Sequence, residues 1–161
     1  MNEAIYELRR LSHQLAPSLE SSVNLYDKID SLVKSMFPTD KLKVNIEVEL
    51  SVNELSSDLQ LAIYRILQEQ LANILKHADA TLLLIVVKRE GKFLDVIIKD
   101  NGKGFDPLQQ RAGLGLNNME ARVKAFAGKI AIHSSPGNGC TVKAVLPFAD
   151  KNTKPDQQSL Y

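Results

Sequence analysis

The pattern of hydrophobic and polar positions first predicts two short helices. Apolar residues recur at helical spacing across residues 4–15, and Pro17 disfavours continuation, so a helix is expected to end near Leu15. A second helical pattern covers residues 23–36, and a serine of the preceding pair Ser21-Ser22 is the expected N-cap. The chain is therefore expected to open with helices.

The pattern then changes to a strand followed by a long helix. Residues 44–50 alternate between apolar and polar side chains, which predicts a strand with one solvated face. From residue 56 to about Ala78 the apolar spacing is helical. The stripe expected to be buried consists of Leu59, Ile63, Leu67, Leu71, Ile74 and Leu75.

A hairpin and a further helix are predicted next. Residues 81–88 and 93–99 are rich in strand-forming residues, and residues 89–92 between them have the composition of a turn. Residues 116–126 again have helical spacing, and Gly128 is the expected stop of that helix.

A second hairpin completes the pattern and indicates the fold class. Residues 130–133 and 141–146 are expected to pair across the turn at residues 135–139. The order of elements predicts an α+β fold, a two-layer α/β sandwich in which a mixed, mostly antiparallel sheet is covered on one face by helices.

Composition and charge exclude several classes of protein. The 161 residues are 44% hydrophobic and 24% charged, which is typical of a globular domain. Twenty Lys and Arg against 19 Asp and Glu leave a formal net charge of +1, too small for a nucleic-acid binder that neutralises many phosphates. No apolar run approaches the roughly 18 to 20 residues of a membrane-spanning helix, and the N-terminus lacks the pattern of a signal peptide. With its single Cys140, the chain is expected to be cytoplasmic.

Polar side chains gather on one face of the long predicted helix. Glu69 and Asn73 are four residues apart and Lys76 is three further on, so all three project from the face opposite the apolar stripe. A carboxylate and an amide oxygen one turn apart can hold a hard cation, and Lys76 with His77 can meet phosphate oxygens. Taken alone, the grouping fits a solvated helix surface better, because Lys76 and His77 suit the helix dipole without a ligand.

The run Asp100-Asn101-Gly102-Lys103-Gly104 follows directly on a predicted strand. Its two glycines let the backbone turn sharply and approach a ligand closely, and Asp100 could accept a hydrogen bond from an adenine amino group. Taken alone, Asp-Asn-Gly is also favourable chemistry for a plain turn. An EF-hand is excluded because Gly102 and Gly104 stand where further oxygen ligands are required.

The run Gly113-Leu114-Gly115-Leu116 precedes a predicted helix, where backbone N–H groups and the helix dipole attract phosphate. A Walker A loop is excluded because no Gly-Lys-Ser or Gly-Lys-Thr occurs. A Rossmann fingerprint is excluded because Asn118 occupies the third glycine position. A lone Gly-x-Gly is weak evidence by itself, so this motif depends on its order behind the other two.

In order and spacing, these three motifs resemble the GHKL ATP-binding fold, or Bergerat fold. Gyrase, the heat-shock chaperones of the ninety-kilodalton class, mismatch-repair proteins and histidine kinases share that fold. Residues 68–78 are similar to the N box of sensor histidine kinases of the nitrate-sensor-like subfamily. Residues 113–123, with residues 135–139 and Pro147, resemble the C-terminal half of the same subfamily. The likeness covers roughly residues 42–148.

The resemblance implies a pocket for ATP and Mg²⁺. Asn73 would ligate Mg²⁺, and Glu69 would lie nearby, orienting water or assisting proton removal. Lys76 and His77 would contact phosphates. Asp100 would accept from the adenine amino group. The remaining implied nucleotide contacts are Gly102 and Gly104, which would admit the base, Gly113, Leu114, Gly115 and Leu116, which would form the end of a short lid, and Thr141.

One position departs from the family pattern. The family usually has Thr directly after the glycine that is Gly139 here, whereas this chain has Cys140 and then Thr141. A thiol is a weaker hydrogen-bond partner than a hydroxyl, which predicts weaker nucleotide binding. Thr141 could also point to the other face of its strand, and Cys140 equally fits a small buried apolar residue.

His13 is not expected to be the phosphate acceptor of such a kinase. Gln14 follows it where acceptors of the family have an acidic residue, and Pro17 soon ends the helix. The segment resembles instead the end of the second helix of a dimerisation hairpin, which would place the acceptor upstream. The expected division is residues 1–37 as the end of that helix plus a connecting helix, 38–149 as the ATP-binding catalytic domain, and 150–161 as a disordered tail.

The implied function is transfer of the ATP γ-phosphoryl group to a histidine, for relay to the receiver domain of a response regulator. The implied partners are the rest of a sensor kinase, which dimerises through the upstream hairpin, and the implied location is the cytoplasm or the cytoplasmic part of a membrane-bound sensor. Two alternatives stay open: a protein serine kinase of the anti-sigma type and a non-catalytic ATP-binding scaffold. The first predicted helix and residues 113–123 favour the histidine kinases, and the intact ligand positions disfavour the scaffold.

Overall fold

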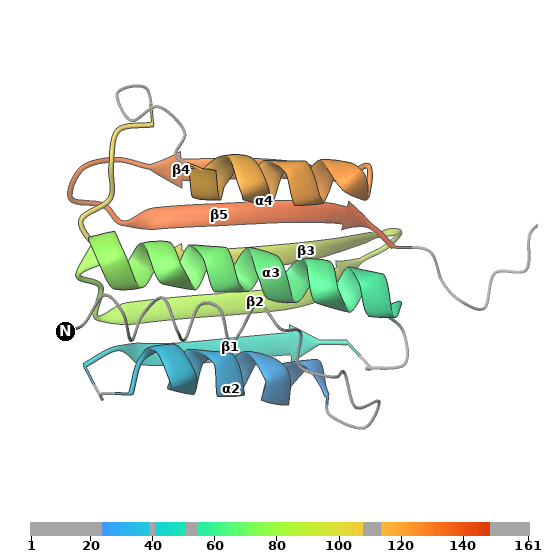
Figure 1. Cartoon of the computed structure of the whole chain (residues 1–161), viewed down its shortest axis with the longest axis horizontal. Coiled ribbons are helices and arrows are strands. Elements are labelled where there is room, and N and C mark those ends of the chain that lie inside the picture. Colours follow the sequence, from blue (N-terminus) through green and yellow to red (C-terminus); the bar gives the residue numbers. More distant parts are fainter. Residues whose placement is uncertain (1–23, 39–40, 51–54, 108–113, 149–161) are drawn as a thin grey trace, which may run out of the picture.

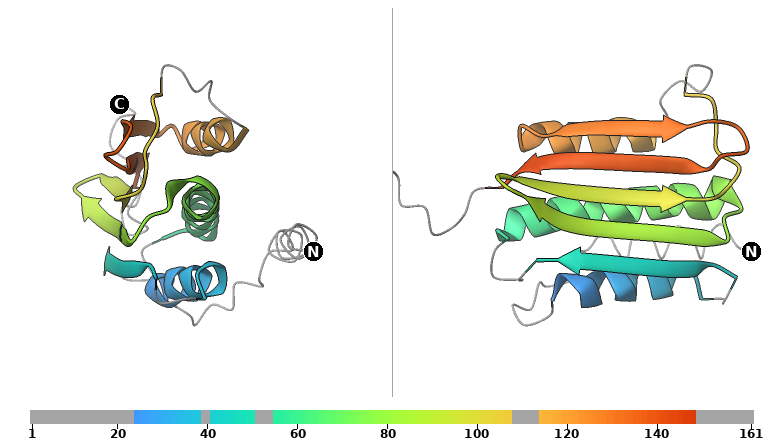
Figure 2. Two further views of the ribbon diagram at one scale, coloured as in Figure 1. Left: turned by 90° about the vertical axis from the view of Figure 1, so that its left-hand side faces the viewer. Right: turned by 180° about the vertical axis from the view of Figure 1, so that it is seen from behind.

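The fold is a two-layer α+β sandwich, as the order of elements predicted. The computed structural model describes residues 24–38, 41–50, 55–107 and 114–148. Within these ranges, a five-stranded sheet is covered on one face by helices α2, α3 and α4, which run side by side along the strands (Figures 1 and 2). The predicted helix at residues 4–15, His13 and the tail at 150–161 lie outside the described residues.

The sheet combines one parallel pairing with three antiparallel ones, in the order β1-β2-β3-β5-β4. Its strands are β1 (Lys43–Glu49), β2 (Leu82–Glu90), β3 (Phe93–Asp100), β4 (Lys129–Ser134) and β5 (Cys140–Pro147). β1 pairs parallel to β2 because α3 carries the chain back across the sheet between them, as a parallel connection requires. β2 with β3 and β4 with β5 form the two predicted hairpins, and β3 pairs with β5. The predicted strands are confirmed.

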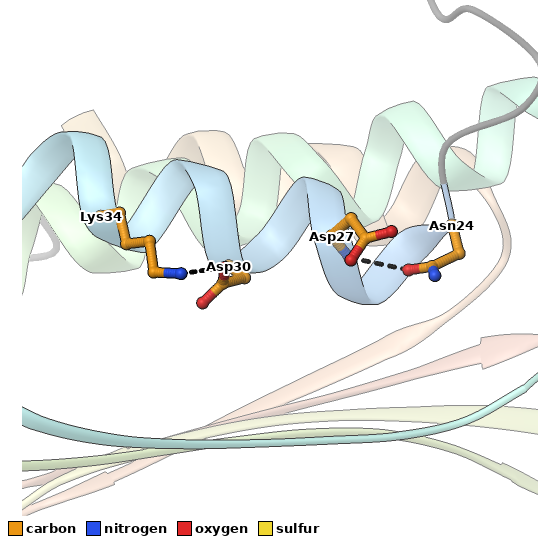
Figure 3. A network of polar contacts seen from close by, with 4 residues as sticks. All are labelled: Asn24, Asp27, Asp30 and Lys34. Atoms are coloured by element: carbon orange, nitrogen blue, oxygen red, sulfur yellow. Dashed lines mark hydrogen bonds and ion pairs between the residues drawn. The ribbon is translucent and has the colours of Figure 1, made fainter.

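Helix α2 (Leu25–Met36) begins one residue after Asn24, which is its N-cap. The Asn24 Oδ1 accepts a hydrogen bond of 2.8 Å from the Asp27 N–H, and Lys34 pairs with Asp30 at 2.7 Å one turn further on (Figure 3). The prediction of a serine cap from the pair Ser21-Ser22 is therefore wrong. Asparagine caps a helix as well as serine does, and the helical pattern alone did not choose between them.

Helix α3 (Ser57–Asn73) is capped by Ser56 and continues into a π-helical turn, η2 (Ile74–Ala78). The predicted stripe is buried except for Leu75, which is 44% exposed. Leu75 lies in η2, where i→i+5 hydrogen bonds replace i→i+4 bonds and interrupt the three-and-four spacing of the core positions. π turns are often found at functional sites, and this one ends at the pocket described below.

Helix α4 (Leu114–Ala125) ends differently from the sequence prediction. The left-handed residue is Ala127, with φ of 53°, and the Gly128 N–H then donates to the Val123 carbonyl oxygen at 2.9 Å. Gly128 is therefore not the left-handed residue of this cap, and its lack of a side chain serves the packing of the next strand. A Cβ at this position would lie 2.6 Å from the Val145 carbonyl oxygen, so glycine permits the start of β4 to pass close to β5.

The core lies between the sheet and the three helices. Ile63, Leu67 and Leu71 of α3 are fully buried over the middle strands, whose inward-facing residues include Ile85 and Ile98. The buried side chains of α2 belong to the same cluster, so this helix packs with the sheet and α3. The proposed boundary between residues 37 and 38 stays a prediction. None of the described helices is both long and apolar enough to cross a bilayer.

We expect Asn24→Ala to lower the free energy of unfolding by about 1 kcal/mol, because it removes the acceptor of the Asp27 N–H. Asn24→Asp keeps an acceptor oxygen and should leave that free energy nearly unchanged. Urea denaturation followed by circular dichroism measures both. The matched control is Asn45→Ala, since Asn45 bonds only an exposed neighbour on β1 in the described structure. Equal losses in Asn24→Ala and Asn45→Ala would contradict the capping role.

Candidate functional site

A cavity of about 260 Å³ opens where four chain segments meet at one end of the sheet. These segments are the end of α3 with η2, the end of β3, the start of β5 and the start of α4, all at the left-hand end of the molecule in Figure 1. The cavity is lined by Gln70, Asn73, Ile74, His77, Ala78, Asp100, Gly104, Phe105, Gly115, Leu116 and Cys140. Motifs that are far apart in the sequence thus form one site.

Most predicted site residues are brought together here, and some are not. Those that line the cavity are Asn73, His77, Asp100, Gly104, Gly115 and Leu116. Lys76 lies on the exposed side of η2 and is not part of the lining. Leu114 is the first residue of α4, and Gly113 lies outside the described residues.

Thr141 is not brought to the cavity. On β5 the buried residues alternate with half-buried ones, and Cys140 belongs to the buried set that faces the helices. Because successive side chains of a strand point to opposite faces, Thr141 projects from the open face of the sheet, beside its partners His133 and Lys99. Cys140 therefore takes the place in the cavity that the sequence had suggested for a threonine hydroxyl.

Asp100 is the most unusual polar group of the cavity. It is 3% exposed, and its Oδ1 accepts a hydrogen bond of 2.8 Å from the Gly102 N–H. Its Oδ2 is buried and accepts no hydrogen bond from the described residues. Burying an acceptor without a partner costs about 1–3 kcal/mol, so a native carboxylate of this kind points to a donor that arrives from outside the chain.

Burial raises the pKa of Asp100 above its usual value. The backbone N–H groups of Gly102 and Cys140, which favour the charged carboxylate, lower this pKa by a smaller amount. The folded state therefore holds the proton of this carboxyl more tightly than the unfolded state does. The contribution of Asp100 to stability is most favourable at low pH and falls as the pH rises from the unfolded pKa through the folded one. At neutral pH the buried charge is a cost to the fold.

The two glycines of the loop after β3 are required by its approach to other backbone segments. A Cβ at Gly102 would overlap the carbonyl oxygen and Cβ of Ala78, and a Cβ at Gly104 would overlap the Ser135 carbonyl oxygen. Gly104 also has φ of +61°, which favours glycine. The sequence predicted a close approach of this loop to a ligand. The structure shows a close approach to protein backbone, and contact of these glycines with a base stays a prediction.

Hydrogen bonds fix this loop to three neighbours. The Lys103 N–H donates to the Ala78 carbonyl oxygen at 2.7 Å, at the end of η2. The Asn101 Oδ1 accepts from the N–H groups of Thr81 and Leu82, which begin β2. The Phe105 N–H donates to the Ser134 hydroxyl at 2.9 Å. Asp100 is therefore held on a rigid support.

The start of α4 lies directly against Glu69. A Cβ added to Gly115 would overlap the Glu69 Oε1, so the Glu69 carboxylate lies against the start of α4 and would have to shift if residue 115 carried a side chain. A carboxylate near a helix N-terminus is favoured by the helix dipole. The first and third sequence motifs are thus in contact, although Glu69 itself does not line the cavity.

Sequence reasoning missed Gln70 as a residue of the cavity. Its side chain is 3% exposed, and its Nε2 lies 3.9 Å from the Cys140 Sγ. The available signal was its position, three residues after Leu67 and three before Asn73, where a polar residue enters the apolar stripe of α3. Burial raises the pKa of Cys140 to about 11, so its sulfur is a neutral thiol at neutral pH.

A site for a metal ion held by protein groups alone is not found in the described part of the chain. No three His, Cys, Asp or Glu side chains cluster there. Asn73 can supply one amide oxygen, and Mg²⁺ commonly takes one or two protein ligands together with substrate phosphates and waters. The donor set of the cavity therefore fits Mg²⁺ only in company with a phosphorylated ligand.

Comparison of the sequence with known proteins identifies a family and its relatives. Residues 58–150 match the family described as Histidine kinase-, DNA gyrase B-, and HSP90-like ATPase. The chain is 32% identical over 151 residues to the sensor histidine kinase MctS of Rhizobium johnstonii, covering 91% of this chain and 32% of the relative. It is 30% identical over 142 residues to the sensor histidine kinase ComP of Bacillus subtilis, covering 86% of this chain and 18% of that relative. The chain spans about a third or less of these relatives.

Solved structures share the fold. The histidine kinase domain of the blue-light activated histidine kinase from Erythrobacter litoralis superposes with a TM-score of 0.64 at 18% identity, over 83% of this chain and 65% of that one. Full-length ShkA, solved in complex with AMPPNP, gives a TM-score of 0.66 at 21% identity, over 84% of this chain and 33% of that one. At these identities, the likeness supports the arrangement of helices and strands.

We expect Gly104→Ala to destabilise the fold more than Gly91→Ala. The two glycines have φ of +61° and +60°, so an alanine carries a similar backbone strain, about 1–2 kcal/mol, at each. The space around them differs, because a Cβ at Gly91 meets nothing within 4 Å. The difference between the two free energies of unfolding, measured by urea denaturation, reports the close approach to Ser135. Equal losses would show that this approach contributes nothing.

Proposed function

The chain belongs to the histidine kinase-, DNA gyrase B- and HSP90-like ATPase family, and we propose that it is the ATP-binding catalytic domain of a two-component sensor histidine kinase. The relatives MctS and ComP, both named sensor histidine kinases, support this choice within the family. They also favour it over a serine kinase of the anti-sigma type. The intact polar groups of the cavity disfavour a scaffold without catalysis.

The observation that carries the proposal is the buried, unpartnered Oδ2 of Asp100. An adenine ring presents an amino group that can donate to this oxygen, and the donor would satisfy an acceptor that has no partner among the described residues. Half of the carboxylate is already held by the Gly102 N–H, so the free oxygen has a fixed direction. AMPPNP, which is bound in the ShkA structure, is an adenine nucleotide, and this also supports the proposal.

The phosphates would extend from the base toward α3 and α4. Asn73 would ligate Mg²⁺, and His77 and Lys76 would contact phosphate oxygens. Gly115 and Leu116 line the cavity at the start of α4, where backbone N–H groups favour anions. Gly113 and Leu114, which directly precede them, would form the end of the lid with them. Thr141 is left out of the nucleotide contacts because it lies on the open face of β5.

Bound Mg²⁺ would neutralise charge on the phosphates, and the chain would position the γ-phosphoryl group for attack by a histidine ring nitrogen. A new P–N bond would form as the bond to the leaving ADP oxygen breaks. Glu69, beside the start of α4, would orient water or assist removal of the proton. The acceptor histidine, the dimerising segments and the receiver domain of a response regulator are proposed partners within the whole kinase.

We expect Asp100→Asn to weaken ATP binding by about tenfold or more, because it replaces a charged acceptor by a neutral amide. Isothermal titration calorimetry with Mg-ATP measures this change. The same variant should be at least as stable as the unaltered chain at neutral pH, since it removes a buried charge whose pKa burial raises. Loss of affinity without loss of stability separates a ligand contact from a structural role.

The matched control is Asp95→Asn, five residues earlier on the same strand. Asp95 is also buried, but it lies on the open face of the sheet, where it pairs with Lys143 at 2.6 Å. This change should lower stability and leave ATP affinity unchanged. Unaltered ATP binding by Asp100→Asn would exclude the assignment of the base pocket.

A further inference from the structure

A chain of side-chain contacts links β5 to the proposed metal ligand. The Gln70 Nε2 approaches the Cys140 Sγ at 3.9 Å, and the Gln70 Oε1 accepts from the Asn73 Nδ2 at 3.5 Å. All three residues line the cavity. The chain therefore runs along the wall of the site, from the strand beside Asp100 to the last turn of α3.

The direction of these contacts determines which end of the Asn73 amide is free. An amide carries two donors on nitrogen and two lone pairs on oxygen, and a cation binds only the oxygen. Because the Asn73 nitrogen donates to Gln70, the oxygen is the end that remains for a ligand. The Gln70 amide is oriented in turn, since its oxygen faces Asn73 and its nitrogen faces the sulfur of Cys140.

We propose that Gln70 is a positioning residue that fixes the Asn73 amide with its oxygen available to Mg²⁺, and that Cys140 holds Gln70 in this orientation. The inference rests on the proposed function, because it requires Asn73 to be the metal ligand. It gives Cys140 a role of its own: its sulfur accepts from the Gln70 amide and so acts on the metal end of the site as well as on the base end.

The placement of Gln70 argues against a packing role alone. It is 3% exposed and lies among the fully buried residues Ile66, Leu67 and Leu71 of α3. A leucine at this position would bury more apolar surface without the cost of desolvating an amide, about 1–3 kcal/mol. The two side-chain hydrogen bonds described for Gln70 are both to residues that line the same cavity, Asn73 and Cys140. Groups that orient a metal ligand in this way commonly affect metal affinity.

The test compares ATP affinity with and without Mg²⁺. Isothermal titration calorimetry gives the ratio of the ATP dissociation constant in EDTA to that in excess Mg²⁺, for the unaltered chain and each variant. In Gln70→Leu we expect this ratio to fall to within about twofold of the ratio in Asn73→Ala, because the affinity measured in Mg²⁺ should drop more than the affinity measured in EDTA. Cys140→Ala should lower the ratio as well, and Cys140→Ser, which keeps an acceptor, should restore it.

The matched control is Gln68→Leu, the same substitution on the same helix at a residue that bonds Arg65 and does not line the cavity. It should leave the ratio unchanged, and circular dichroism should show that every variant is folded. A ratio that falls in Asn73→Ala but stays unchanged in Gln70→Leu would overturn this inference alone. Equal weakening of ATP binding with and without Mg²⁺ in Gln70→Leu would overturn it in favour of packing. No ATP binding by the unaltered chain would overturn the proposed function and this inference together.

Discussion

The buried carboxylate of Asp100 is the constraint on which the site depends. A charge that is 3% exposed must be held by donors, and the described chain supplies a hydrogen bond to one oxygen and leaves the other without a partner. Such an arrangement persists only where the surrounding fold overdetermines it, because the unpaired acceptor costs free energy until a ligand arrives. A preformed acceptor loses little conformational freedom on binding, so the fold bears this cost in advance of the nucleotide.

The backbone around Asp100 explains why glycines surround it. Gly102 lets the loop pass against Ala78, Gly104 lets it pass against Ser135, and a Cβ at Gly139 would overlap the carbonyl oxygen of Asp100 itself. These approaches bring η2, β3 and β5 together at one end of the sheet. The glycines therefore affect ligand binding indirectly. They let the walls of the cavity come close enough together to bury the Asp100 carboxylate.

The elements were largely predictable from sequence because the sheet and helices follow simple periods. The alternation in β1 and the stripe of α3 predicted which faces pack inward. The three motifs were expected to form one site, and Asn73, Asp100 and Gly115, one from each motif, line the same cavity. The exposure of Leu75 was not predictable from a period of 3.6, because the π turn is a local departure from it. Whether Gln70 and Thr141 line the cavity depends on which face of their helix or strand meets it. Tertiary packing decides this, and it could not be predicted from the periodicity of the sequence.

We propose that the free oxygen of Asp100 recognises the amino group of adenine. Inosine triphosphate has the same sugar and phosphates as ATP, but its base carries an oxygen in place of that amino group. The most direct measurement is therefore the ratio of the dissociation constants of the two nucleotides for the unaltered chain, by isothermal titration calorimetry in Mg²⁺. We expect inosine triphosphate to bind at least about tenfold more weakly, because two acceptors would face each other in a buried site. Equal affinity for the two nucleotides would contradict it.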